Sequence, residues 1–244
     1  MSATGRFFGI GVGPGPAGYL PVAALEALRE ANIIYLPRAQ QAEISVARQC
    51  LGGLDIDADR LREIEFTMAL DRSVLRDYYA QIAERFAGEL QAGHHVAYLT
   101  IGDSMTYSTY GYLLAALLDR LPDLHYKTFP GVTSYAAAAA AMNWPVGEGK
   151  ERVLILPCPD EPELLTHDIQ THDVIVLMKI GKRLPWVLDL LRKLDIAQHC
   201  ALATRIGLPG ESLHNDLTRF GATEEAGYLA TLLIRHTPRR RRHV

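Results

Sequence analysis

An apolar run, Phe7–Val12, ends at once in a loop made only of glycine and proline, Gly13-Pro14-Gly15-Pro16. From Pro21 onward the apolar residues recur at the spacing of a helix. A buried strand, a tight loop and a helix in this order form the repeating unit of α/β proteins. The opening therefore predicts that the first strand of a sheet ends where a glycine loop leads into a helix.

Strands and helices alternate along the rest of the chain. Further strands are predicted at Ile33–Leu36 (ended by Pro37), Val96–Ile101, Val153–Leu156, Val174–Met178, Cys200–Thr204 and Tyr228–Ile234. Helices are predicted at Val74–Leu90, Tyr107–Leu121, Ser134–Met142 and Pro185–Leu194. The alternation predicts an α/β fold with mostly parallel sheets covered by helices. Taking Pro122–Pro130 as the crossing between halves, we expect two α/β domains, 1–124 and 125–238, with a cleft between them.

The net charge of −3 includes a basic tail, 239–244, in which Arg239–Arg242 carry four positive charges. The rest of the chain is therefore more acidic than the total, which disfavours binding to a nucleic acid backbone. A run of arginines at a chain end is either a solvated tail or a basic arm, and the position after Pro238 favours the solvated tail.

The three cysteines, Cys50, Cys158 and Cys200, lie far apart and show no Cys-x-x-Cys spacing. This pattern argues against a disulfide framework and a zinc site, and fits the reduced cytoplasm. The longest run of small apolar residues, Ala136–Met142, is much shorter than the ~20 residues of a membrane-spanning helix, and the beginning of the sequence lacks the pattern of a signal peptide. We therefore expect a cytoplasmic protein with neither a membrane segment nor a bound metal.

The glycine loop resembles a dinucleotide-binding fingerprint, which makes an NAD-dependent oxidoreductase one reading of the sequence. Two features disfavour it. Pro14 and Pro16 have no N–H to offer a phosphate, and the second strand ends in Leu36-Pro37-Arg38 without the acid that binds a ribose hydroxyl. A tight strand-to-helix turn explains the same glycines equally well.

Two other loops follow predicted strands or open helices. Gly102 and Asp103 come directly after an apolar strand, where open α/β sheets bind ligands; the alternative is that Asp103 caps the next helix. Pro130–Ser134 precedes the alanine-rich helix, for which Thr133 or Ser134 is a suitable N-cap. Such loops can converge on one cleft, which disfavours a third reading, a non-catalytic binding protein.

The ordered combination of Gly11–Gly15, Gly102–Asp103 and Pro130–Ser134 resembles the tetrapyrrole methylases over nearly the whole chain. The run Gly102–Tyr112, Pro130–Tyr135 and Met178-Lys179 are similar to the members of that family that methylate C(20) of precorrin-2. Ser104 departs from many relatives, which carry proline there. Pro16 and Ala17 stand where the family commonly has an acid, so no role is carried over to them.

The resemblance implies two α/β domains, S-adenosyl-L-methionine as cofactor, a tetrapyrrole as substrate and a homodimer. Its cofactor contacts fall on Gly102, Asp103, Met105, Thr133, Ser134, Met178 and Ala203. Its substrate contacts fall on Gly13, Pro14, Gly15, Tyr107, Lys179 and Arg205. The reaction implied is transfer of a methyl group to C(20) of precorrin-2, giving precorrin-3A in cobalamin biosynthesis.

Three points stay open in the sequence. The acceptor is either metal-free precorrin-2 or cobalt-factor II, and another ring position is the alternative to C(20). No residue is identified as the base that removes the proton after methylation; the histidines His94, His95, His167 and His172 are candidates by residue type alone.

Overall fold

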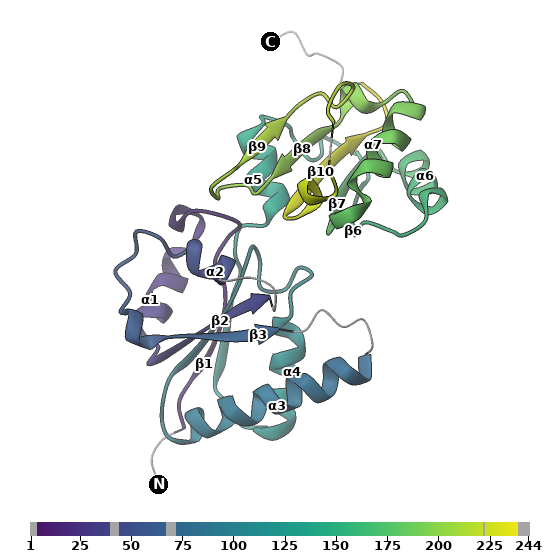
Figure 1. Cartoon of the computed structure of the whole chain (residues 1–244). Helices are drawn as coiled ribbons and strands as arrows, with labels where there is room; N and C mark the ends of the chain where they lie inside the picture. Colours follow the sequence, from purple (N-terminus) through teal and green to yellow (C-terminus); the bar gives the residue numbers. More distant parts are fainter. Residues whose placement is uncertain (1–3, 40–43, 67–71, 222, 239–244) are drawn as a thin grey trace. The chain divides into compact units, whose positions relative to one another are not determined.

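The computed structural model describes residues 4–39, 44–66, 72–221 and 223–238, so the basic tail lies outside the described residues. The chain divides into two compact units, Met1–Thr133 and Ser134–Val244. Each unit is built on a five-stranded sheet of its own (Figure 1). The predicted α/β fold with two sheets and covering helices is confirmed.

The first unit contains β1 (Phe7–Gly11), α1 (Val22–Glu30), β2 (Ile33–Ala39), α2 (Val46–Gln49), β3 (Leu61–Phe66), α3 (Arg72–Gln91), β4 (Val96–Thr100), α4 (Tyr110–Arg120) and β5 (Tyr126–Phe129), with short 3₁₀ turns at Ala17–Tyr19 and Ala58–Arg60. Its strand order is β3-β2-β4-β1-β5, and every neighbouring pair is parallel. The carboxyl ends of all five strands therefore lie at one edge.

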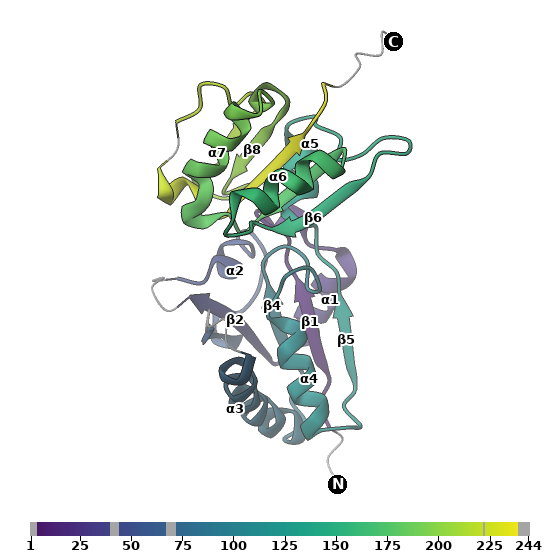
Figure 2. The ribbon, with the colours of Figure 1, turned by 90° about the vertical axis from the view of Figure 1, so that its right-hand side faces the viewer.

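Both faces of the first sheet are covered, which is why β1 and β4 are buried along their whole length. On one face Phe7 and Tyr98 pack with Phe86 of α3 and Tyr110 of α4. Helix α1 covers the opposite face (Figure 2) through its buried residues, Ala24, Ala27 and Leu28. The apolar runs Phe7–Val12 and Val96–Ile101 of the sequence are β1 and β4, two inner strands of this sheet.

The second unit contains α5 (Ser134–Ala141), β6 (Val153–Pro157), α6 (Pro162–Thr171), β7 (Val174–Met178), α7 (Leu184–Lys193), β8 (Ala201–Thr204), β9 (Ser212–His214) and β10 (Ala230–Arg235), with 3₁₀ turns at Gly181–Arg183, Ala197–His199 and Glu224–Gly227. Its strand order is β6-β7-β10-β8-β9. Alternate residues of β10 face opposite sides of the sheet. Leu232 and Ile234 pack in the core formed with α6 and α7, while Thr231 faces α5.

The expectation of a mostly parallel sheet is wrong for the second unit. Among the neighbouring pairs of its described strands, only β6 and β7 are parallel. β9 runs antiparallel to β8, and the chain then returns to the edge where β7 and β8 end, so that β10 starts there and runs antiparallel to both. The sequence of β10 does not reveal its direction. A strand that is buried on both faces is a continuous apolar run whether it is parallel or antiparallel to its neighbours.

Proline does not end β2, contrary to the sequence prediction. The strand continues through Pro37 to Ala39 and pairs with β3 along this part. Pairing with β4 on the other side reaches only Tyr35. Pro37 therefore lies beyond the last pair that β2 forms with β4, and its missing N–H is tolerated there as it is on an edge strand.

The segment Pro122–Pro130 is not a crossing between halves. Residues 126–129 form β5, which pairs with β1 at the edge of the first sheet. The two compact units meet in sequence at Thr133 and Ser134 rather than at 124 and 125. β5 was missed because it is short, and Tyr126 and Lys127 are exposed at the sheet edge.

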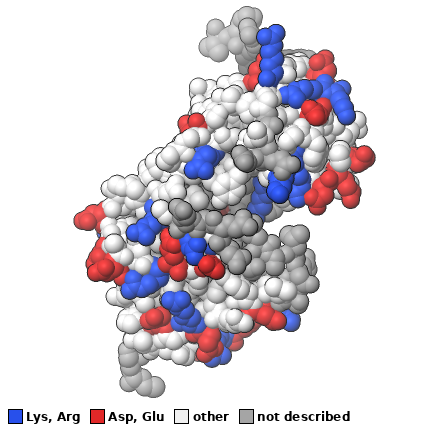
Figure 3. Space-filling view, in the orientation of Figure 1, with Lys and Arg blue, Asp and Glu red and all other residues white. Residues whose placement is uncertain are grey.

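The described helices include none that is long and apolar enough to span a membrane. On the face seen in Figure 3, lysines and arginines are interspersed with acidic residues over both units and form no continuous basic field. The three cysteines are buried and free of disulfide bonds.

Candidate active site

The three sequence motifs of the first unit meet at the carboxyl edge of its sheet. They follow β1, β4 and β5, which are neighbours in the sheet. The Gly13 N–H donates to the Gly102 carbonyl at 3.1 Å, and the Gly102 N–H donates back to Gly13 at 2.8 Å. The Gly131 N–H donates to a carboxylate oxygen of Asp103 at 3.1 Å. We call residues 11–15, 102–106 and 129–133 the loop cluster.

Glycine is required in the loop cluster because backbones touch there. A Cβ atom on Gly131 would lie 2.0 Å from the Gly102 carbonyl oxygen, and one on Gly11 would lie 2.6 Å from the Gly131 nitrogen. Gly13 has a φ of 78°, a conformation that glycine adopts without strain. The predicted substrate contacts Gly13, Pro14 and Gly15 are themselves buried, so in this structure they pack the loop.

Asp103 organises the loop that contains it. Besides the Gly131 N–H, its carboxylate accepts hydrogen bonds from the Met105 N–H and the Thr106 hydroxyl, both at 2.9 Å. The alternative reading of Asp103, as the cap of the following helix, is wrong, because α4 begins only at Tyr110. A charge-assisted bond of this kind stabilises a loop more than a neutral one, so Asp103 fixes the spacing between the segments after β4 and β5.

Ser104 was not among the predicted site residues, yet it makes the second bond between the same segments. Its side chain is fully buried, and its hydroxyl donates to the Phe129 carbonyl at 2.9 Å. The Ser104 carbonyl in turn accepts a bond from the Ser108 hydroxyl. Consecutive residues, Asp103 and Ser104, thus hold both sides of the turn at Pro130. The only signal in the sequence was the serine itself, in place of the more common proline.

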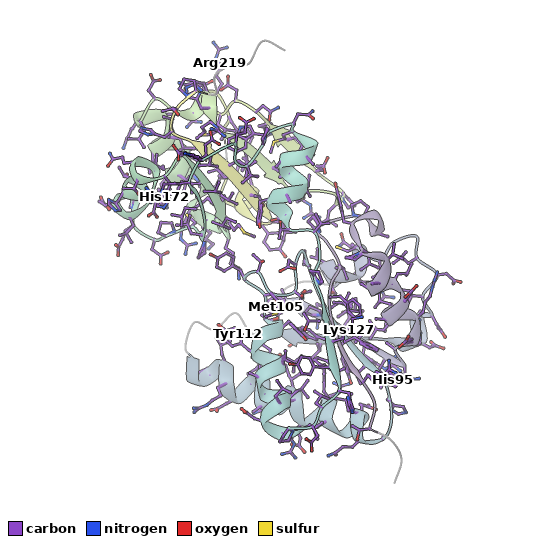
Figure 4. The ribbon with its side chains drawn as sticks, turned by 180° about the vertical axis from the view of Figure 1, so that it is seen from behind. His95, Met105, Tyr112, Lys127, His172 and Arg219 are labelled. Carbon is purple, nitrogen blue, oxygen red and sulfur yellow. The ribbon has the colours of Figure 1, made fainter. Side chains whose placement is uncertain are left out.

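Beyond Ser104 the loop presents apolar side chains to solvent. Met105 is 65% exposed and Tyr107 42% exposed, and Tyr107 has a φ of 51°. Figure 4 shows Met105 on the loop that leads into α4 and Tyr112 on α4 itself. Tyr112 is also exposed and stacks on buried Tyr79, with ring centroids 5.7 Å apart.

In the second unit, three residues with left-handed backbone lie at one edge of the sheet. Lys179 follows β7, Arg205 follows β8, and Leu229 precedes the antiparallel β10; their φ values are 52°, 51° and 53°. The Arg205 N–H donates to the Leu229 carbonyl at 3.0 Å. Positive φ is uncommon outside glycine and concentrates at functional sites. This edge also contains the predicted cofactor contacts Met178 and Ala203, in β7 and β8.

The cations of this edge differ in their surroundings. Desolvation lowers the pKa of the Lys179 ammonium, because a partly dry environment disfavours its charged form. Arg205 donates through Nε to the Pro209 carbonyl at 2.7 Å. Arg183 pairs with Asp160 and donates to the Lys179 carbonyl at 3.3 Å. Lys179 and Arg205, both predicted substrate contacts, therefore lie at the same sheet edge.

The four candidate histidines lie elsewhere. His94 and His95 precede β4, at the amino edge of the first sheet, and Figure 4 shows His95 at the end of the unit away from Met105. His95 accepts a hydrogen bond from the Arg6 N–H at 3.0 Å. His167 is on α6, and His172 precedes β7. Within the described ranges, no group of three or more His, Cys, Asp or Glu residues is placed to hold a metal ion.

The loop cluster suits a cationic ligand. Asp103 is the only charged residue within 11–15, 102–106 and 129–133. The nearby cation Lys127 lies outside these segments, with its Nζ 4.9 Å from the Phe129 ring centroid. A positively charged ligand would meet the Asp103 carboxylate in the cluster, while exposed Met105 offers apolar contact. The fold and this cluster together define a two-unit α/β protein whose first sheet carries an ordered loop cluster at the carboxyl ends of parallel strands, the edge where open α/β sheets bind ligands.

The chain belongs to the Tetrapyrrole (Corrin/Porphyrin) Methylases, a family whose pattern matches residues 6–219. A cobalt-precorrin-2 C(20)-methyltransferase of Salmonella typhimurium is 26% identical over 94% of this chain and 96% of its own length. A precorrin-2 C(20)-methyltransferase of Sinorhizobium is 27% identical over 94% and 95%. The uroporphyrin-III C-methyl transferase of Thermus thermophilus, solved with S-adenyl homocysteine, has a TM-score of 0.60 at 17% identity and covers 94% of this chain and 97% of that structure.

Proposed function

We propose that the protein is an S-adenosylmethionine-dependent C-methyltransferase that methylates C(20) of precorrin-2, in its metal-free or cobalt-containing form, during cobalamin biosynthesis. Membership of the tetrapyrrole methylases supports the reaction class. Two relatives that align over nearly their full length are named for C(20). The single structural observation that carries the proposal is the loop cluster, in which the Gly13–Gly102 and Asp103–Gly131 hydrogen bonds join the three family motifs.

The cofactor contacts that we propose are those carried over from the family, Gly102, Asp103, Met105, Thr133, Ser134, Met178 and Ala203. When bound, S-adenosylmethionine supplies an electrophilic methyl group. Since the sulfonium is reactive by itself, the protein's task is to align donor and acceptor and to keep water away. A loop cluster whose backbones are locked by hydrogen bonds provides that alignment without reorganisation.

The proposed substrate contacts are Gly13, Pro14, Gly15, Tyr107, Lys179 and Arg205. Precorrin-2 carries several carboxylates, and Lys179 and Arg205 supply two cations to bind them. Tyr107 offers an exposed ring for contact with the macrocycle. Gly13–Gly15 contribute through the packing of the first loop against Gly102.

We also propose that the protein functions as a homodimer in the cytoplasm. The family resemblance supports the dimer, and the free, buried cysteines agree with a reducing compartment. Light scattering of the purified protein tests the dimer directly, because a monomer mass at micromolar concentration would contradict it.

The experiment for the reaction is anaerobic incubation of the purified protein with S-adenosylmethionine and either precorrin-2 or cobalt-factor II. We expect a mass gain of one methyl group in one of the two acceptors and release of S-adenosylhomocysteine. The acceptor that reacts places the enzyme on the metal-free or the cobalt route. An Asp103→Ala variant is the control, since it removes the bond between the loops; we expect it to fold and to lose most of its activity. Cofactor binding without methylation of either acceptor would contradict the proposed substrate.

A further inference from the structure

One residue that sequence reasoning missed lies among the proposed cofactor contacts of the second unit. Thr231 is the second residue of β10, the central strand of the sheet. It pairs in register with Ala203 of β8. On the other side, Leu232 pairs with Leu177 of β7, which places Thr231 next to Met178. Thr231 therefore sits between two of the contacts carried over from the family.

Thr231 is also bonded to a third of these contacts. Its side chain is 2% exposed, and its hydroxyl donates to the Ser134 hydroxyl oxygen at 2.9 Å. Ser134 is the first residue of α5 and follows the Gly131–Thr133 segment of the loop cluster. A hydroxyl has one proton and two acceptor positions. Because the Ser134 oxygen accepts from Thr231, the Ser134 proton is directed elsewhere.

The hydroxyl at position 231 is not needed for packing. The face of β10 that meets α5 is otherwise lined by small or apolar side chains, including Leu233 and Ala203 from the sheet and Ala137 and Ala138 from the helix, all buried. Valine has the same branched shape as threonine and suits a buried strand. A buried hydroxyl is disfavoured unless it is hydrogen-bonded, and the bond to Ser134 satisfies this one.

We infer that Thr231 is a positioning residue for the cofactor: its hydroxyl fixes the Ser134 hydroxyl as a hydrogen-bond donor to S-adenosylmethionine. Thr231 itself acts through Ser134 and need not touch the ligand. The inference rests on the proposed function, since it requires that S-adenosylmethionine binds and that Ser134 contacts it.

The test compares four variants, Thr231→Val, Thr231→Ser, Ser134→Ala and the double variant Thr231→Val/Ser134→Ala. Binding of S-adenosylhomocysteine is measured by calorimetry, and KM for S-adenosylmethionine and kcat by initial rates. We expect Thr231→Val to weaken binding and raise KM about fivefold to tenfold, the equivalent of one hydrogen bond, with kcat unchanged. Thr231→Ser, which keeps the hydroxyl, restores the affinity. The double variant binds no more weakly than Ser134→Ala, because both changes remove the same bond.

The matched control is Thr128→Val in the first unit. There the Thr128 hydroxyl of β5 bonds the Tyr110 hydroxyl of α4 at 2.6 Å, a strand-to-helix hydroxyl pair of the same kind. We expect Thr128→Val to lower Tm as Thr231→Val does and to leave KM unchanged.

Two results would overturn the inference: Thr231→Val lowers Tm without changing KM, or Thr231→Ser binds as weakly as Thr231→Val. If Thr231→Val does not fold, the inference is tested with Ser134→Ala alone. An unchanged affinity of that variant for S-adenosylhomocysteine would also overturn the inference. Absence of cofactor binding in the unaltered protein would instead contradict the proposed function.

Discussion

At the scale of single residues, the candidate site depends on two short side chains that fix one turn. The Asp103 carboxylate accepts from Gly131, and the Ser104 hydroxyl donates to Phe129. These bonds reach the chain on either side of Pro130, which has no N–H of its own to anchor the turn. The turn is therefore positioned by side chains that come from the loop after β4.

Ser104→Ala tests this role, because the variant leaves the buried Phe129 carbonyl without its hydroxyl partner. We expect a loss of about 1–3 kcal/mol in the free energy of unfolding and weaker binding of S-adenosylhomocysteine. Ser45→Ala is the matched control. Ser45 is equally buried, and its hydroxyl donates to the Pro37 carbonyl at 2.6 Å. Urea unfolding should show a similar loss of stability in both variants. Calorimetry should show weaker binding of S-adenosylhomocysteine in Ser104→Ala alone, and equal affinities of the two variants would contradict this role of Ser104.

Gly9→Ala tests how closely β1 packs on α4. A Cβ atom on Gly9 would lie 2.1 Å from ring atoms of Tyr110, whose side chain is fully buried. Overpacking of this kind costs about 1–3 kcal/mol, and we expect thermal unfolding to reveal it as a lower Tm. Gly88→Ala on the exposed side of α3 meets no atom within 4 Å and should raise stability by about 0.5–1 kcal/mol. An unchanged Tm for Gly9→Ala would show that Tyr110 moves freely.

At the scale of elements, the sequence predicted those strands whose burial is continuous. β1, β4 and β7 are apolar runs and were predicted to within one residue at either end. β3 and β5 were missed because both are edge strands with charged or exposed residues and lack that signal. The Thr231–Ser134 bond joins residues 97 positions apart, so no local pattern indicates it. The three loop motifs were predictable because each directly follows a recognisable strand or precedes a helix.

The end of β10 is tied to the segment after α5 by an ion pair. Arg235 is 5% exposed, and its guanidinium bonds both carboxylate oxygens of Glu151 while lying 5.3 Å from the ring centroid of Trp144. Lysine keeps the positive charge, but its ammonium group cannot bond both carboxylate oxygens of Glu151 in the same bidentate geometry. It also lacks the planar group that stacks on the Trp144 ring. We expect Arg235→Lys to cost about 2 kcal/mol or more, measured by urea unfolding at pH 7. Arg120→Lys, at an exposed pair with Glu84, should change stability by less than about 1 kcal/mol. Equal effects of the two substitutions would contradict this account of β10.

At the scale of the whole molecule, both units contain buried thiols that make stability depend on alkaline pH. Burial raises the pKa of Cys50 and Cys200 to about 12, and that of Cys158 to about 11. In the unfolded chain these thiols ionise near pH 9, so above that pH the unfolded state binds fewer protons than the folded state. Stability therefore falls as pH rises from 9 to 11, by about 1 kcal/mol per thiol at pH 10.

Urea unfolding at pH 8 and pH 10 checks this dependence. A Cys200→Ala variant serves as its control, and its stability difference between the two pH values should be smaller by about 1 kcal/mol. Equal stability of the unaltered protein at both pH values would contradict the burial of the thiols.

The most direct test of the proposed function is the position of the transferred methyl group. The protein is incubated without oxygen with precorrin-2 or cobalt-factor II and S-adenosylmethionine labelled with ¹³C in its methyl group, and the product is examined by NMR. We expect a single new methyl resonance, assigned to C(20), together with release of S-adenosylhomocysteine. A methyl group at any other ring carbon would leave the family assignment in place and contradict the proposed C(20) specificity.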